Sequence, residues 1–382
     1  MTTDIALTNM NDGRNSPKSP QKMYIIIGIV VSIVVVGLGL GLGLGLGLQA
    51  KGKSSSSSSA APQTLFVING GSSSLSKMDM TTNAISATVQ LAGVTFPHHG
   101  NLSPDMTRMV VGVPGMDLSG GHSGLMSGMP GKFVVLSTSS LNILKTVNLP
   151  NMNHNAAFSP DGTEIWAGQM ISQGVVLVID STTFVTKKVI PVGGMPLEVS
   201  FSFDGSMAFV CNSMNGTVSI ISVANKNIMK TVAVGEDPVG AWPGVNNMMY
   251  VDNEMSQTIS IIDVATMSTT GTITLGFAPG MASYNPNDQT VWVTDGTNGK
   301  VVVFSKQNTV LQTITTGTGA HGIAFSSDFL RVYITNQGAD TVSVIDTMTR
   351  LKVTDITVGK KPNGMILYQM NGQMNGSPHT NH

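Results

Sequence analysis

Three histidines occupy the same position relative to a recurring turn. His98, His154 and His321 each stand seven residues before an acidic turn residue (Asp105, Asp161 and Asp328). Histidine is largely neutral at pH 7 and is the commonest metal ligand in proteins. Three imidazoles that converge on one point would suit copper or zinc. The alternative interpretation is that they are polar residues hydrogen-bonded inside a wet channel.

Two further polar residues lie one position later than this equivalent site. They are His99 and Glu198. Successive side chains of a regular strand point to opposite faces, so both should point away from the three histidines. They could join them only if the strand is irregular at its start.

A glycine-rich insertion adds a second set of candidate ligands. The segment 115–131 reads GMDLSGGHSGLMSGMPG and carries Met116, His122, Met126 and Met129. Thioether and imidazole ligands together favour copper, whereas calcium prefers oxygen ligands. The segment is long enough to fold as a lid over the histidines. The sequence thus predicts a copper site made from the three histidines and this loop.

The elements that must position these residues come from an internal repeat. From residue 64 onward, units of about 40–45 residues recur, each with four short strands, a period typical of propeller blades. The second strands of the units begin at Leu65, Met109, Trp166, Phe209, Tyr250, Val291 and Val332. Seven such units predict an all-β, seven-bladed β-propeller of four-stranded antiparallel blades over residues 64–370.

Several of these strands carry a family pattern. The segments VYIT at 332–335, VWVT at 291–294, TVSVID at 341–346 and TISIID at 258–263 resemble the YVTN-type β-propeller repeat family. The resemblance implies the propeller architecture and says little about activity. Related propellers of nitrous-oxide reductase and haem-d nitrite reductase use histidines on this face as cofactor ligands. This chain lacks a second copper domain and a haem-attachment motif, so neither activity is carried over.

The phase of the repeat predicts how the ring closes. The first unit begins on its second strand, whereas the last unit ends with an additional strand, 363–369. That strand should become the innermost strand of the first blade and leave no open edge to aggregate. The three histidines would then lie on blades 7, 2 and 3, along one arc of the channel mouth.

Composition excludes several classes of protein. Of 382 residues only 11% are charged, and the single Cys211 rules out a disulfide scaffold. After residue 63 the chain has 15 basic and 19 acidic residues, a formal charge of −4. No nucleic-acid partner is expected, because such surfaces need clustered Lys and Arg.

The N-terminal part predicts a membrane anchor. Residues 23–48 contain no charge, and about 20 apolar residues span a bilayer as a helix. A cleaved signal is the alternative, although its apolar region is usually shorter. Residues 1–22 are predicted to be a disordered polar leader, 49–63 a Ser-rich stalk, and 371–382 a disordered tail. Three basic residues before the span and two after it weakly place the propeller outside the cytoplasm or in a lumen.

Three functions remain open at this level. The first is a membrane-anchored binding or interaction module with copper at the channel mouth and a protein or small-molecule partner on the propeller loops. The second is a metal-dependent enzyme of the lactonase or lyase type, which would need a deep axial pocket with a carboxylate. The third is a purely structural cell-surface protein. One propeller scaffold hosts many functions, so the fold cannot choose among them.

Overall fold

The computed structural model describes residues 63–121 and 129–369. The predicted leader, membrane span, most of the stalk and the tail lie outside these residues, as do His122 and Met126. Within the described residues, no helix is long and apolar enough to cross a bilayer.

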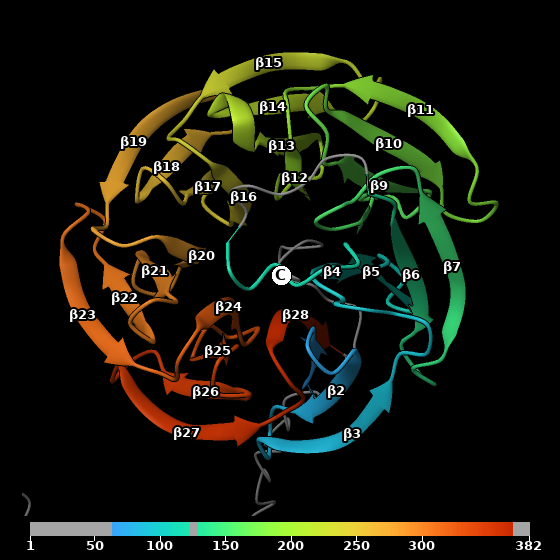
Figure 1. The fold of residues 1–382 in the computed structure, drawn as a ribbon. Coiled ribbons are helices and arrows are strands. Elements are labelled where there is room, and N and C mark those ends of the chain that lie inside the picture. Colours follow the sequence, from blue (N-terminus) through green and yellow to red (C-terminus); the bar gives the residue numbers. More distant parts are fainter. Residues whose placement is uncertain (1–62, 122–128, 370–382) are drawn as a thin grey trace, which may run out of the picture. The chain divides into compact units, whose positions relative to one another are not determined.

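The described strands form seven antiparallel sheets of four strands, arranged as blades around a central axis (Figure 1). The predicted seven-bladed β-propeller is therefore confirmed. Blade 1 contains β28 (Pro362–Gln369), β1 (Gln63–Asn69), β2 (Ser74–Asp79) and β3 (Ala84–Gln90). Blade 2 contains β4 (Gly100–Leu102), β5 (Arg108–Val113), β6 (Gly131–Ser137) and β7 (Ile143–Leu149), and blade 3 contains β8 (Ala157–Phe158), β9 (Glu164–Gln169), β10 (Val175–Asp180) and β11 (Thr186–Pro191). Blade 4 contains β12 (Pro196–Phe201), β13 (Met207–Asn212), β14 (Thr217–Ser222) and β15 (Ile228–Ala233).

The remaining blades follow the same order from the axis outward. Blade 5 contains β16 (Pro238–Gly244), β17 (Met248–Asn253), β18 (Thr258–Asp263) and β19 (Ser268–Thr274). Blade 6 contains β20 (Pro279–Asn285), β21 (Thr290–Asp295), β22 (Lys300–Phe304) and β23 (Val310–Thr315). Blade 7 contains β24 (Ala320–Phe325), β25 (Arg331–Asn336), β26 (Thr341–Asp346) and β27 (Leu351–Thr357). A short 3-10 helix, Ser213–Asn215, joins β13 to β14.

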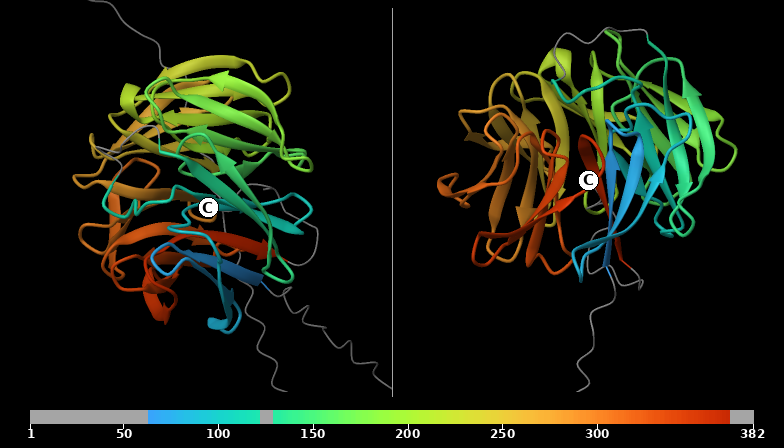
Figure 2. Two further views of the ribbon diagram at one scale, coloured as in Figure 1. Left: turned by 45° about the vertical axis from the view of Figure 1, so that its right-hand side comes forward. Right: turned by 60° about the horizontal axis from the view of Figure 1, so that its bottom comes forward.

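Ring closure follows the predicted pattern. The last strand, β28, pairs antiparallel with β1, with Leu65 opposite Leu367 and Phe66 opposite Ile366. Figures 1 and 2 show this C-terminal strand beside the N-terminal strands of blade 1. The two ends of the described chain are thus joined within one sheet, and the backbone hydrogen bonds of β28 are satisfied there.

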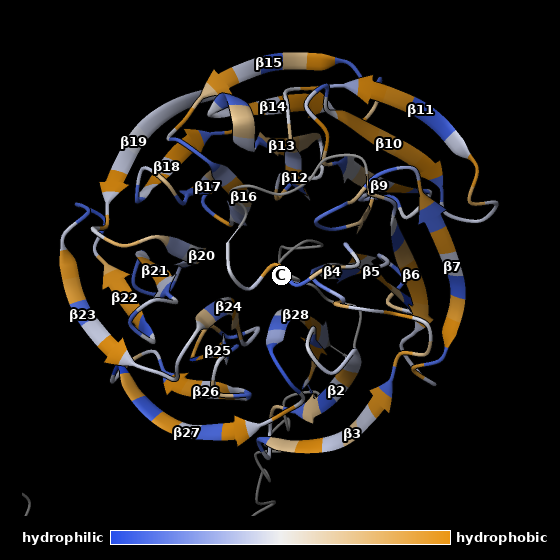
Figure 3. Ribbon diagram, in the orientation of Figure 1, coloured by the Kyte–Doolittle hydropathy of each residue, from blue (hydrophilic) through white to orange (hydrophobic). Residues whose placement is uncertain are grey.

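Burial varies from the middle to the rim of each blade. Middle strands such as β10 (VVLVID) are buried along most of their length, because both faces pack against neighbouring blades. Outermost strands such as β11 (TKKVIP) are exposed at five of six positions. Figure 3 shows the same contrast between apolar middle strands and mixed outer strands.

In blades 1, 4 and 7 an equivalent asparagine fastens the incoming linker to the blade. The Asn336 side-chain amide donates to Thr341 Oγ1 (3.0 Å) and Ser343 Oγ (2.9 Å), while its oxygen accepts the Gly317 N–H (3.0 Å). The equivalent sets are Asn69 with Ser74, Ser76 and Gly359, and Asn212 with Thr217, Ser219 and Gly193. The asparagine that ends the VYITN segment therefore hydrogen-bonds both to the linker that enters the blade and to the next strand of that blade.

The same contact explains the glycine in the linkers that these asparagines hold. A Cβ on Gly317 would lie 2.8 Å from Asn336 Cγ, and one on Gly359 would lie 2.5 Å from Asn69 Cγ. Both separations are below van der Waals contact, so a larger residue would push the linker off the asparagine. The glycine is required by close approach rather than by backbone conformation.

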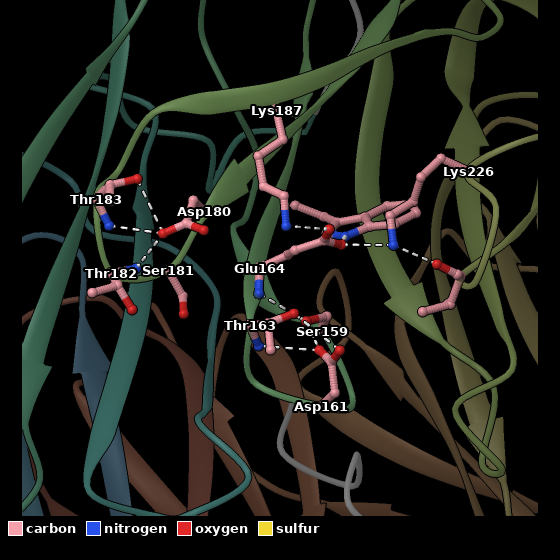
Figure 4. Close-up of polar contacts among 12 residues, drawn as sticks. Ser159, Asp161, Thr163, Glu164, Asp180, Ser181, Thr182, Thr183, Lys187 and Lys226 are labelled. Carbon is pink, nitrogen blue, oxygen red and sulfur yellow. Dashed lines mark hydrogen bonds and ion pairs between the residues drawn. The ribbon is translucent and has the colours of Figure 1, made fainter.

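An ion-pair network joins blades 3 and 4 near the rim (Figure 4). Glu164 on β9 contacts Lys187 on β11 (3.1 Å) and Lys226 of blade 4 (2.8 Å), and it accepts the Trp166 indole N–H (3.0 Å). Burial raises the pKa of Glu164, but Lys226, Trp166 and Lys187 together outweigh burial and lower it. The carboxylate is therefore held ionised between two blades.

Substitution of the linker glycine tests this architecture. We expect Gly317→Ala to lower the free energy of unfolding by about 1–3 kcal/mol, the cost of overpacking a close contact. Gly271→Ala is the matched control, because its new Cβ would meet only Ile261 Cδ1 at 3.6 Å. The measurement is chemical denaturation of both variants; equal stability of the two would contradict the proposed role of the close approach.

Candidate metal centre

Four imidazoles and one carboxylate meet at the channel mouth. The His98 ring centroid lies 4.3 Å from those of both His99 and His154, and 5.9 Å from that of His321. His98, His99 and His154 are 1%, 3% and 0% exposed, and Glu198 is 5% exposed. We call these five residues the histidine cluster. The structure thus brings all three sequence-equivalent histidines to one place.

Close backbone packing sets the positions of these side chains. A Cβ on Gly112 of β5 would lie 2.7 Å from Asn155 Cα, so only glycine allows the segment bearing His154 to approach blade 2 this closely. Gly364 of β28 lies equally close, because its Cβ would lie 3.0 Å from His99 Cδ2. His98 and His99 precede β4. The His98 N–H donates to the Gly112 carbonyl (2.9 Å), and the Gly112 N–H donates to the His99 carbonyl (2.8 Å).

Glu198 orients two of the histidines. Its Oε2 lies 2.7 Å from His154 Nδ1 and 3.1 Å from His99 Nδ1. An ionised carboxylate can only accept, so the Nδ1 atoms of both rings carry the hydrogen. The Nε2 of His99 is buried and has no hydrogen-bond partner among the described residues. A metal-binding histidine has this arrangement, with one nitrogen bonded to a carboxylate and the other holding a lone pair.

The carboxylate is itself fixed by a neighbouring amide. Asn155 Nδ2 donates to Glu198 Oε1 (2.5 Å) and to the Val199 carbonyl (2.9 Å), and Asn155 Oδ1 accepts the Val199 N–H (3.0 Å). Burial raises the pKa of Glu198, but the positive field of His99 and the hydrogen bonds from His154 and His99 outweigh it and lower the pKa to about 2. Glu198 therefore stays ionised inside the protein across the ordinary pH range.

The participation of Glu198 and His99 departs from regular strand alternation. The pairing of β12 with β13 shifts register between Pro196 and Val199, so the side chain of Glu198 turns toward the axis. A bulge of this kind re-aims a side chain and is common beside functional sites. Pro196, which opens the strand, is the sequence signal that could have predicted the bulge, because proline within sheets is confined to strand starts and bulges.

A second buried acid was not expected from the sequence. Asp252 on β17 is 0% exposed and accepts the Trp242 indole N–H and the Gly240 N–H (3.2 Å). Burial and the nearby Glu254 charge raise its pKa well above the usual range. Its partner Trp242 packs edge-on to His99, with ring centroids 6.0 Å apart. Asp252 thus fixes one wall of the histidine cluster.

The loop methionines are placed differently from the histidines. Met116 packs against an apolar cluster that includes Leu118 and Leu197, and Met129 is 41% exposed. Figure 1 shows the segment after β5 crossing the central opening toward β16. Asp117 is held there by Lys361 of blade 1. The described part of the insertion is therefore tied to blade 1, and its role as a lid stays a prediction.

Three imidazoles of the cluster bring nitrogen donors near one another. One nitrogen from each of His98, His99 and His154 lies within 4.8 Å of the others, and tetrahedral zinc sites bring such atoms to about 3.3 Å from one another. The separation of the nitrogen atoms is therefore wider than in a site that holds its ion. The one buried carboxylate beside several imidazoles also favours one additional positive charge, either a proton or a metal cation.

The fold and this site define a seven-bladed β-propeller with a buried histidine–carboxylate cluster on its axis. No family model matches the chain, and no curated protein matches it. Solved structures do share the fold. The periplasmic gluconolactonase PpgL of Pseudomonas aeruginosa is 16% identical with a TM-score of 0.64, covering 81% of this chain and 100% of that chain.

Two other solved propellers are similar. Hydrazine synthase of Kuenenia stuttgartiensis is 15% identical with a TM-score of 0.62, covering 74% of this chain and 92% of that one. Dihydro-haem d1 dehydrogenase NirN is 13% identical with a TM-score of 0.57, covering 80% of this chain and 75% of that one. These likenesses establish the propeller architecture that the YVTN resemblance implied.

The pH dependence of stability tests the ionisation of Glu198. Its pKa is lowered from 4.5 to about 2, so its contribution is complete above pH 4.5 and disappears as the pH falls toward 2. We expect Glu198→Gln to cost about 1.5–3 kcal/mol at pH 7, because the Nδ1–H groups of His99 and His154 lose a charged hydrogen-bond acceptor. The cost should shrink steadily below pH 4.5.

The measurement is chemical denaturation of the wild type and the variant at pH 7, 4 and 3. Glu236→Gln is the control, because Glu236 is exposed on the loop face. A cost that stays constant from pH 7 to pH 3 would contradict an ionised Glu198 in the folded protein.

Proposed function

We propose that this protein is a metal-binding propeller whose histidine cluster holds a divalent transition-metal ion, copper in preference to zinc. The observation that carries the proposal is the pair of contacts from Glu198 Oε2 to His99 Nδ1 and His154 Nδ1. They leave Nε2 of His99, which has no hydrogen-bond partner among the described residues, as a nitrogen suited to a metal. A carboxylate behind a ligating histidine fixes its tautomer and raises its basicity.

The choice of metal rests on the donors. The cluster supplies imidazole nitrogens, which suit copper, zinc, iron and nickel, and affinity for such a site rises to a maximum at Cu(II). Calcium and magnesium prefer oxygen ligands. Since Glu198 is committed to two histidines and Asn155, nitrogen dominates the set of available donors.

A bound ion fits this site better than an organic substrate does. The alternative of a lactonase- or lyase-like enzyme needs a carboxylate near the axis, and Glu198 supplies one. However, His98, His99, His154 and Glu198 are all at most 5% exposed. The described residues thus close over the cluster and favour a ligand of atomic size. The similarity to a gluconolactonase, at 16% identity, supports the scaffold alone.

Metal content is the direct test. We expect the untagged full-length chain in detergent, after exposure to Zn(II) or Cu(II) and gel filtration, to retain a single metal ion per chain by mass spectrometry. His98→Ala/His154→Ala should retain none, and Glu198→Gln should bind about 10–100-fold more weakly. Cu(II) should displace Zn(II) and show nitrogen couplings in its electron paramagnetic resonance spectrum.

The control for this experiment removes histidines elsewhere in the chain. His379→Ala/His382→Ala changes the two C-terminal histidines and should leave the metal content unchanged. Circular dichroism of every variant checks that the propeller remains folded. A folded wild-type protein that retains no metal would overturn the proposal, as would full retention in His98→Ala/His154→Ala.

We also propose that residues 23–48 anchor the propeller to a membrane and that the propeller lies on the non-cytoplasmic side. The support is 26 consecutive residues without a charge, long enough for a spanning helix with some tilt. The full-length chain should stay in the membrane pellet after an alkaline wash, and a chain beginning at residue 63 should be released. Release of both forms would contradict the anchor.

A further inference from the structure

Several methionines share one apolar cluster with residues of the segment 115–121 after β5, which we call the covering loop. Met152, Met170 and Met195 are buried (1%, 1% and 7% exposed) and share one apolar cluster with Leu118 and Leu197, against which Met116 of the loop packs. We call Met116, Met152, Met170 and Met195 the methionine cluster. Leu118 belongs to the covering loop, whereas Leu197 directly precedes Glu198 in the sequence.

The backbone holds the three buried methionines in fixed relation to one another. The Met170 N–H donates to the Met152 carbonyl (2.8 Å), and the Met195 N–H donates to the Ile171 carbonyl (2.8 Å). Met152 also stands two residues before His154. The methionines are therefore carried on rigid segments of blades 3 and 4, next to the segments that carry the histidine cluster.

The density of methionine distinguishes this cluster from other parts of the core. Methionine makes up three of its six buried members, against three of eleven in the cluster between blades 7 and 1 and one of twenty in the largest apolar cluster of the described residues. Thioethers are soft, polarisable ligands on flexible side chains, and they select Cu(I) among biological metals.

We propose that the methionine cluster is a second metal site that binds a monovalent soft cation, Cu(I), through thioether sulfurs. It differs from the histidine cluster in ligand type and in charge, since it contains no ionisable side chain. Loop residue Met116 would complete the site, because the ion pair of Asp117 with Lys361 holds the loop over it. The proposal is independent of whether the histidine cluster holds an ion.

The test uses Ag(I), a monovalent cation with the same preference for thioether ligands that undergoes no redox change. Full-length protein in detergent and chloride-free buffer is titrated with silver nitrate and followed by native mass spectrometry and calorimetry. We expect Met152→Leu/Met170→Leu/Met195→Leu to bind one Ag(I) fewer per chain than the wild type. Each substitution conserves volume, so the variant should remain folded.

The matched control makes the same chemical change at buried methionines outside the cluster. Met78→Leu/Met249→Leu/Met281→Leu replaces three side chains that are 0% exposed and should bind as much Ag(I) as the wild type. Equal Ag(I) binding by the two triple variants, both folded by circular dichroism, would overturn the proposal and make the methionines core packing only.

The two proposed sites can fail separately. His98→Ala/His154→Ala should keep the Ag(I) ion that the methionine triple variant loses, and the methionine variant should keep its Zn(II). Loss of the same Ag(I) ion in the histidine variant would assign that ion to imidazole and overturn the thioether site. Absence of Zn(II) binding in the wild type would overturn the histidine site and leave the thioether site standing.

Discussion

Closure of the ring is the constraint on which the other features of this propeller depend. The pairing of β28 with β1 makes the C-terminal strand the innermost strand of blade 1, which lies between blades 7 and 2. His321 and His98 belong to those two blades and meet only because the ring is closed. A single packed ring also allows each blade to bury both of its faces, which no isolated blade can do.

The second organising interaction is electrostatic and lies on the axis. A buried carboxylate is costly unless it is paired and hydrogen-bonded, and Glu198 meets both conditions through His99, His154 and Asn155. Its low pKa means that the cluster contains a permanent negative charge facing several imidazoles. Such a site favours the binding of a positive charge. Whether that charge is a proton or a metal ion depends on how the imidazole nitrogens are oriented.

The repeat made the architecture predictable, and departures from the repeat made part of the site unpredictable. Segments such as VYITN define the second strand, and the turn containing Asp161 fixes the phase that placed His154 at the mouth. Each of these signals is local in sequence. The sequence predicted that Glu198 points away from the axis, because side chains alternate along a regular strand. That alternation does not hold at the bulge after Pro196. The burial of Asp252 depends on packing between blades and has no local signal.

The distribution of polar residues around the axis separates the scaffold from the site. Blade 6 has the same strand order as the others, yet near the start of its inner strand it carries Met281, which is buried in the apolar core. Blades 7, 2, 3 and 4 carry His321, His98, His154 and Glu198 near the corresponding strand starts. Identical backbones therefore carry different side chains on the two sides of the channel. The backbone of each blade satisfies its own hydrogen bonds without the residues at the mouth. The side chains at the mouth are therefore free to differ according to the chemistry of the site.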